Sequence, residues 1–359
     1  MSRPVPILLI HGYNGEPVNW TAFRTALITR GADPDLIRVF HYGWLEELTT
    51  PVESTGPSLA QRAPFSHPAS TSESLTRRYN NWAGIHEIAA RLGRRDTSDP
   101  VYARSQLVRL SEASVARGGP AKVTIVAHSM GGLVARYYLS RQTPDERGTV
   151  NEGVVGRLIT IATPHLGVEF ARILQLIPRD AFIWHVLRWL EKLPFVRGEP
   201  MTELLQLESQ VEALQASVLA AEFPVAAQGY LDSLALRQMT PGSEFLEQLN
   251  RPGTFPPDVE AALLWGDVRL AATVRWGALT LWGRAITLGD LLVPASSAST
   301  LPHATPTCLP FTWAREFEVQ VGERAVAPYN LMDFLPPVAH SNLLYNADVH
   351  AAVARLVGL

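Results

Sequence analysis

The sequence predicts an α/β protein built on a mostly parallel sheet with helices on both faces. Short apolar runs rich in β-branched residues are expected to be strands, at residues 5–10, 36–42, 122–128 and 156–163. Amphipathic stretches lie between them, at residues 20–30, 101–117 and 131–141. Strands that alternate with helices indicate βαβ units and a parallel sheet. The strands are continuously apolar, as expected where helices cover both faces.

Three segments interrupt this alternation. Residues 49–74 and 294–310 are rich in Pro, Ser and Thr, so they are expected to be surface loops. Residues 169–236 are dominated by helical spacing, which indicates a helical cap inserted into the domain. We therefore expect residues 1–168 and 237–359 to form the core.

The composition excludes several classes of protein. Of the 359 residues, 47% are apolar and 18% are charged, which suits a folded domain with a large core and not a disordered chain. The net charge is −3 and there is no long basic run, so nucleic acid is not an expected partner. Cys308 is the single cysteine, which excludes an internal disulfide, and we expect its thiol to be inert.

No segment has the roughly 18 uncharged apolar residues that a membrane span requires. The apolar run at residues 6–10 is short and leads directly into a turn, so it is interpreted as a strand and not as an export signal. If Met1 is the native start, a cytoplasmic location is expected.

The stretch "VTIVAHSMGGLVARYYL" (123–139) places Ser129 where a buried strand meets a helix. A serine at such a sharp turn projects its hydroxyl out of the sheet and needs small neighbours, here Ala127 and Gly131. The helix N-terminus adds unpaired N–H groups that can stabilise an oxyanion. A simple serine N-cap is the structural alternative. The strand, the small-x-Ser-x-Gly turn and the helix together favour a nucleophile.

A nucleophilic serine needs a histidine base and a carboxylate to orient that base. With this type of turn, the order along the chain is serine, acid, histidine. Asp290 in "ITLGDLLVPASSAS" (286–299) follows a short apolar run and is the preferred acid. Asp267 and Asp333 are the alternatives.

His340 is the preferred base because it directly precedes a C-terminal helix that would cover the sheet. His350 falls inside that helix and is expected at its surface. His303 lies in the Pro-rich loop, close to Asp290 in sequence, and is less suitable.

Five stretches together resemble the lipase and esterase branch of the α/β-hydrolases, in particular bacterial triacylglycerol lipases: "AHSMGGLVARYYL", "PILLIHGYNG", "ATPHLG", "GDLLVPASSAS" and "AHSNLL". The resemblance implies an α/β-hydrolase fold in which Ser129, Asp290 and His340 form the catalytic triad. It also implies that the backbone N–H groups of Tyr13 and Met130 form the oxyanion hole. No cofactor is expected.

The predicted function is hydrolysis of carboxylic esters, with a small-molecule or lipid ester as substrate and transient contact with a lipid surface. An acyltransferase or thioesterase with the same triad is the alternative, and a catalytically silent binding protein is a further one. Residues 170–196 of the expected cap are rich in large apolar side chains. Trp184 and Leu187 are predicted to line an acyl-binding groove, and packing against the core or against another subunit is the alternative for these residues.

Some lipases of this kind hold a structural metal. His67, His86 and Asp96 lie near one another in sequence, but their spacing matches no ligand motif, so no metal is predicted. His165 in "TPHLG" is expected to be a hydrogen-bonded structural histidine.

Overall fold

The computed structural model describes most of the predicted core. The described residues are 3–13, 15, 17–40, 84–93, 105–145, 150–168, 233–276, 278–320 and 336–359. The loop predicted at residues 49–74 and nearly all of the predicted cap, residues 169–232, lie outside them. Of the predicted cap, only residues 233–236 are described. Ser233 caps a short helix there, and Ala235 and Leu236 are buried in the core.

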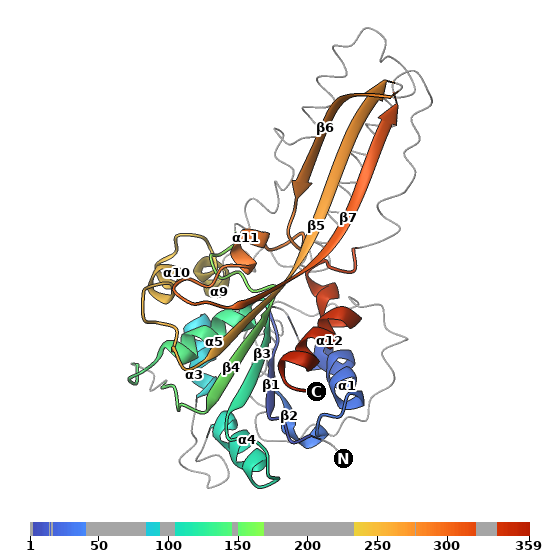
Figure 1. Ribbon diagram of the computed structural model, residues 1–359. Coiled ribbons are helices and arrows are strands. Elements are labelled where there is room, and N and C mark those ends of the chain that lie inside the picture. The colour runs from blue at the N-terminus through green and yellow to red at the C-terminus, as the bar shows by residue number, and fades with distance from the viewer. Residues whose placement is uncertain are drawn as a thin grey trace, which may run out of the picture.

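In the described part of the chain, a mostly parallel sheet of seven strands forms the centre, as predicted (Figure 1). Its order is β2 (Ile37–Phe40), β1 (Ile7–Ile10), β3 (Val123–His128), β4 (Val155–Ile161) and β5 (Glu260–Trp276), all parallel. Parallel strands end at the same edge of a sheet, so the loops that follow β1, β3 and β4 start on one side of the core.

Strand β5 is long enough to change neighbours along its length. Its first half, from Glu260 to Leu264, pairs with β4. Its second half, from Arg269, pairs antiparallel with β6 (Leu279–Thr287). Strand β7 (Thr307–Gln320) pairs parallel with β5 on the other side along nearly the whole of β5. The three strands therefore extend beyond the core as an arm (Figure 1).

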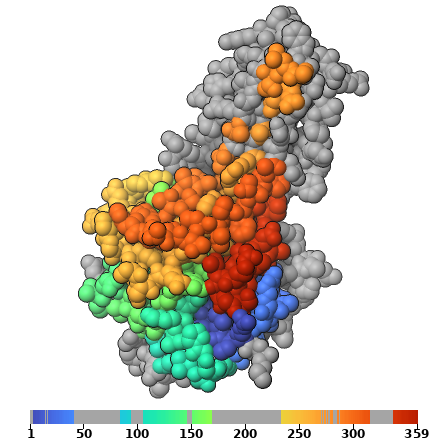
Figure 2. Space-filling view, in the orientation of Figure 1, coloured from blue at the N-terminus to red at the C-terminus, as the bar shows by residue number. Residues whose placement is uncertain are grey.

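Helices cover both faces of the sheet. One face carries α3 (Ile85–Leu92), α4 (Gln106–Val115) and α5 (Met130–Ser140). The other carries α1 (Thr21–Thr29) and α12 (Ala347–Leu356), which lie side by side although they come from opposite ends of the chain (Figures 1 and 2). The remaining described helices are short: η1 (Pro17–Trp20), η2 (Pro34–Leu36), α9 (Leu234–Gln238), α10 (Glu244–Leu249), α11 (Ala295–Ala298) and η7 (Ser341–Tyr345).

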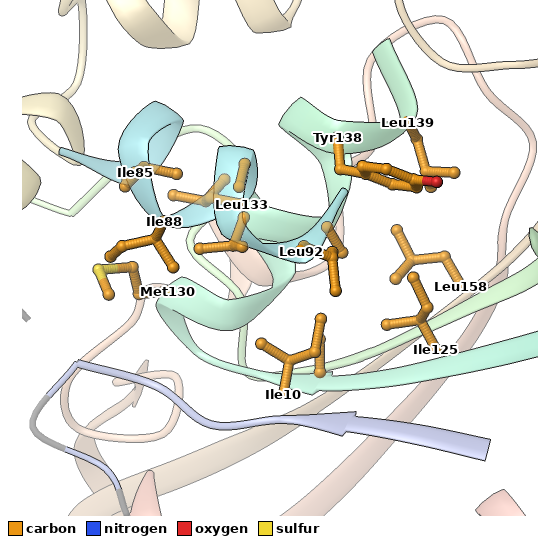
Figure 3. Packing of buried hydrophobic residues seen from close by; sticks show 14 of the residues in the cluster. Ile10, Ile85, Ile88, Leu92, Ile125, Met130, Leu133, Tyr138, Leu139 and Leu158 are labelled. Carbon is orange, nitrogen blue, oxygen red and sulfur yellow. The ribbon is translucent and has the colours of Figure 1, made fainter. Parts of the chain in front are cut away.

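Alternate residues of the inner strands supply the two halves of the core. Ile10 and Ile125 face α3 and α5, where they pack with Ile88, Leu133 and other buried residues (Figure 3). Leu9, the neighbour of Ile10 in β1, packs in the cluster on the opposite face. This alternation is what a sheet that is buried on both faces requires.

Two predictions about local structure are wrong. Residues 307–310 were expected in a loop, but they begin β7. Among the described strands β7 pairs with β5 on one side, so Pro310 lies at an edge of the described sheet, where proline is tolerated. His350 was expected at the surface of the last helix, but it is buried. Its Nε2–H donates to the carbonyl of Leu344 at 2.7 Å, and its ring packs edge-on against Phe23.

Candidate active site

Ser129 occupies a sharp turn between β3 and α5. Its φ is 53°, a conformation that is unusual for a residue with a side chain and that commonly marks functional sites. The surrounding backbone holds this turn, because the Ser129 N–H donates to the carbonyl of Ile161 at 2.8 Å. The Ser129 carbonyl accepts from the N–H of Gly132 at 3.0 Å and from the hydroxyl of Thr163 at 2.9 Å.

Small residues around this turn are needed because other segments pass very close. A Cβ on Gly131 would lie 2.8 Å from the carbonyl oxygen of Ile10. A Cβ on Gly12 would lie 2.7 Å from the Cβ of Ser129. The loop after β1 and the serine turn are therefore in direct contact, and glycine is the residue that fits at both positions.

Asp290 lies in the turn after β6 and is 1% exposed. Its Oδ1 accepts from two backbone N–H groups, those of Leu292 at 3.0 Å and Val293 at 2.6 Å. Its Oδ2 lies 2.8 Å from Nδ1 of His340. The carboxylate is thus held on one oxygen by its own turn and presents the other to the imidazole.

His340 lies immediately before η7 and is 2% exposed. Because a carboxylate oxygen faces its Nδ1, that nitrogen carries the proton and Nε2 is left as an acceptor. The backbone N–H of His340 also donates to the carbonyl of Asp290 at 3.0 Å. Gly266 in β5 leaves room for this segment, since a Cβ there would overlap the carbonyl oxygen of Val338.

His128, which directly precedes Ser129, brings the two halves of the site together. Its Nε2 lies 3.2 Å from the carbonyl oxygen of His340, and the two rings have centroids 4.7 Å apart. Burial lowers the pKa of His128 well below its usual value, and the neighbouring His340 lowers it further. The site therefore brings together residues from three segments, which are β3, the turn after β6 and the segment before η7.

Two observations identify the fold. One is the order of the strands in the sheet. The other is the order along the chain of a serine in a strained turn after β3, then Asp290, then His340. The chain has the α/β-hydrolase fold. A strained strand-to-helix turn like that at Ser129 is the geometry of a nucleophile elbow, and the Asp290–His340 pair has the geometry with which a carboxylate orients a base. That the three residues act as a catalytic triad stays a prediction.

The two residues predicted to form the oxyanion hole flank the elbow. Met130 is the first residue of α5, so its N–H has no acceptor within the helix. Tyr13 lies next to Gly12, which touches Ser129, and the Tyr13 hydroxyl donates to Oγ of Ser233 at 3.2 Å. That these two N–H groups bind an oxyanion stays a prediction.

The alternative residues lie elsewhere or have other partners. Asp267 accepts from Nε of Arg269 at 2.6 Å. His303 is exposed, and Asp333 lies outside the described residues. His165 is buried and hydrogen-bonded as predicted, with its Nε2 3.1 Å from Oγ1 of Thr160.

Other predicted residues cannot be placed. Trp184 and Leu187, predicted to contact substrate, lie outside the described residues. Of the candidate metal ligands, His86 lies in α3 with its Nδ1 2.6 Å from Nε2 of Gln238, whereas His67 and Asp96 lie outside. The described part of the chain contains no group of three or more His, Cys, Asp or Glu that could hold a metal ion.

Sequence reasoning missed two buried polar residues, one beside Ser129 and one in the helix that follows it. One is His128, which stood within the elbow motif but was not singled out. The other is Arg136 in α5, a buried guanidinium that donates to the carbonyl of Leu249 at 3.1 Å and to Oδ1 of Asn250 at 2.7 Å. Burial lowers the pKa of Arg136 to about 9. Nothing in the sequence near Arg136 indicates that it would be enclosed.

One family model and several solved structures match this chain. A family model described as a domain of unknown function (DUF7379) matches residues 97–275, just under half of the chain. No curated protein matches the sequence significantly.

Several solved structures match the chain at low identity and with TM-scores below 0.5. Phospholipase PlaB from Legionella pneumophila is 11% identical with a TM-score of 0.38, and the match covers 99% of this chain and 58% of PlaB. EstA from Clostridium botulinum is 12% identical with a TM-score of 0.43, covering 99% of this chain and 87% of EstA. The mature lipase BlEst2 from Bacillus licheniformis is 13% identical with a TM-score of 0.44, and the match covers 100% of this chain and 95% of BlEst2. The present chain therefore spans less than two thirds of PlaB, and its fold assignment rests on its own sheet order and elbow.

None of the helices in the described ranges is long and apolar enough to cross a membrane.

Proposed function

We propose that this protein is a serine hydrolase that cleaves carboxylic esters of lipid-like substrates through an acyl-enzyme. The observation that supports this most directly is the buried pair of Asp290 and His340, with Nδ1 and Oδ2 2.8 Å apart, beside the strained elbow of Ser129. Lipases and esterases among the structures that share the fold are consistent with the reaction class.

In the proposed reaction, Nε2 of His340 takes the hydroxyl proton of Ser129 as the serine oxygen attacks the ester carbonyl. The carbonyl oxygen becomes an oxyanion, which the N–H groups of Tyr13 and Met130 stabilise. The imidazolium then gives its proton to the departing alcohol, which leaves the acyl group on Ser129.

Water completes the cycle. His340 removes a proton from water as the water attacks the acyl-enzyme, and the same proton returns to Ser129 when the acid leaves. Asp290 keeps its negative charge throughout and stabilises the imidazolium. If an alcohol or amine replaces water in this step, the same groups perform acyl transfer, which is the alternative function.

A labelling experiment tests the proposal. A fluorophosphonate probe should react with the wild-type protein at Ser129, and Ser129→Ala should abolish both labelling and the hydrolysis of p-nitrophenyl butyrate. Ser296→Ala removes an exposed serine of α11 and should change neither. Labelling that persists in Ser129→Ala would refute the assignment. Products formed with added alcohols would separate hydrolysis from acyl transfer.

A further inference from the structure

We propose that His128 is a positioning residue that holds the backbone of His340 against the nucleophile elbow. The inference rests on the proposed function, because it concerns how base and nucleophile are aligned. His128 is the last residue of β3 and is 5% exposed, and its Nε2 lies 3.2 Å from the carbonyl oxygen of His340.

Two further bonds of His340 show what this contact adds. The side chain and the backbone N–H of His340 both bond to Asp290, which lies in the turn after β6. Those two bonds align the imidazole with its carboxylate but do not tie it to β3. The bond from His128 connects the segment of His340 to the residue next to Ser129. It therefore acts on the distance between base and nucleophile, on which proton transfer depends.

The bond also fixes which form of His128 is present. A carbonyl oxygen can only accept, so Nε2 of His128 carries a proton. The titratable groups facing the ring are His340 and His11, and Asp290 lies on the far side of His340. Burial and these histidines lower the pKa of His128, so the ring is neutral at neutral pH. A neutral neighbour adds no repulsion when His340 becomes an imidazolium.

The packing leaves the His128 ring little freedom. A Cβ on Gly12 would lie 3.1 Å from Nδ1 of His128, so the loop after β1 closes over that side of the ring. The His340 ring lies on another side, tilted by 47°. The donor is thus held by contacts on both sides. The alternative is that His128 only fills space in the core. The two roles predict different results for side chains that differ in length and in whether they carry a hydrogen-bond donor.

Three substitutions separate these roles. Gln places its amide nitrogen near the position of Nε2 and keeps the donor. Asn is shorter and mimics Nδ1, which is not the bonded atom. Phe keeps the ring and removes the donor. We expect His128→Gln to keep kcat within about threefold for p-nitrophenyl butyrate. His128→Asn and His128→Phe should lower kcat by about 10-fold to 100-fold, with KM changed less than twofold.

His350 provides a matched control for loss of the same kind of bond. It is also a buried histidine whose Nε2 donates to a backbone carbonyl, that of Leu344, but it packs among α1 and α12. His350→Phe should lower the melting temperature as much as His128→Phe and should leave kcat unchanged. The pH profile of kcat for His128→Gln should match the wild-type profile, because the residue replaced is neutral throughout that range.

Two outcomes would overturn the proposal. If His128→Phe is as active as wild type, the bond does not position His340. If His128→Gln is as impaired as His128→Phe, or its pH profile shifts, the imidazole itself takes part and His128 is not a positioning residue.

A second measurement is independent of turnover. The proton between Nδ1 of His340 and Asp290 should give a low-field NMR signal that is absent in Asp290→Asn. This signal should persist in His128→Gln and weaken through solvent exchange in His128→Phe. If wild-type protein hydrolyses no ester, the proposed function fails, whereas the NMR signals still decide whether His128 holds His340. An unchanged signal in His128→Phe would then reject the inference.

Discussion

His340 and Asp290 are joined by two hydrogen bonds, one between their side chains at 2.8 Å and one between their backbones at 3.0 Å. The backbone bond keeps the two segments in register even when the side-chain bond is altered. A substitution at Asp290 should therefore change the chemistry of the site more than its architecture.

Asp290→Asn should lower kcat by roughly 10³–10⁴, because the amide no longer selects the Nδ1–H tautomer or stabilises the imidazolium. The protein should remain folded, which circular dichroism and urea unfolding can verify. Asp267→Asn is the matched control, since Asp267 is buried but paired with Arg269. It should cost stability and keep kcat within about threefold. The reverse ranking would assign the acid to Asp267.

Gly266→Ala should displace the segment that carries His340, because the added Cβ would overlap the carbonyl oxygen of Val338 and would lie 3.0 Å from Cβ of Asp290. We expect kcat to fall by about 10-fold to 100-fold and the free energy of unfolding to fall by about 1–3 kcal/mol. Gly156→Ala alters a glycine near the start of β4, at the opposite end of the sheet. It should affect only stability, and equal losses of kcat in both variants would contradict the prediction.

Acid should destabilise the fold through buried histidines. Burial lowers the pKa values of His128 and His165 well below 6.5, and the charge of Arg136 lowers that of His165 further. Below pH 6.5 the unfolded chain therefore binds more protons than the folded chain. The free energy of unfolding should fall with pH, by up to about 1.4 kcal/mol per pH unit for each histidine, until pH reaches the folded-state pKa.

Urea unfolding between pH 7.5 and pH 5 measures this slope. His165→Gln should reduce the slope relative to wild type by removing one such group. His303→Asn changes an exposed histidine and should leave the slope unchanged, and asparagine tolerates the φ of 59° at that position. Identical slopes in all three proteins would show that buried histidines do not govern the acid sensitivity.

The predicted cap gives a prediction about substrate length. If Trp184 and Leu187 line an acyl-binding groove, kcat/KM should rise from acetyl toward longer p-nitrophenyl esters, since each buried methylene contributes about 0.8 kcal/mol. Trp184→Ala and Leu187→Ala should flatten that rise. If acetyl is the best substrate and neither variant alters the profile, the cap does not form the acyl site and the protein is a short-chain esterase.

Much of the core could be predicted because its strands are short, apolar and separated by amphipathic helices. Strands β1 to β4 and helix α5 begin and end within a few residues of their predicted positions. The elbow could be predicted because a strained turn restricts the residues beside Ser129 to small ones. The close pairing of Asp290 with His340 follows an order along the chain that the elbow implies.

Other features depend on contacts between distant segments, which periodicity does not reveal. The arm was missed because the outer half of β5 pairs with β6 and β7, and local sequence patterns do not reveal which strands pair. The burial of His350 follows from the packing of α12 against α1. The role of His128 as a donor depends on where residue 340 returns to the sheet, which a local pattern around residue 128 cannot specify.

The sheet order has a consequence for where this domain can be divided. The matching family model begins at residue 97, yet β1, which lies between β2 and β3 in the interior of the sheet, is formed by residues 7–10. A fragment of residues 97–275 would retain Ser129 but would leave the edge of β3 unpaired and its apolar faces partly uncovered. Such a fragment should aggregate when expressed alone. The cooperative folding unit must include segments on both sides of the matched region, and its assembly requires slow closure of long loops.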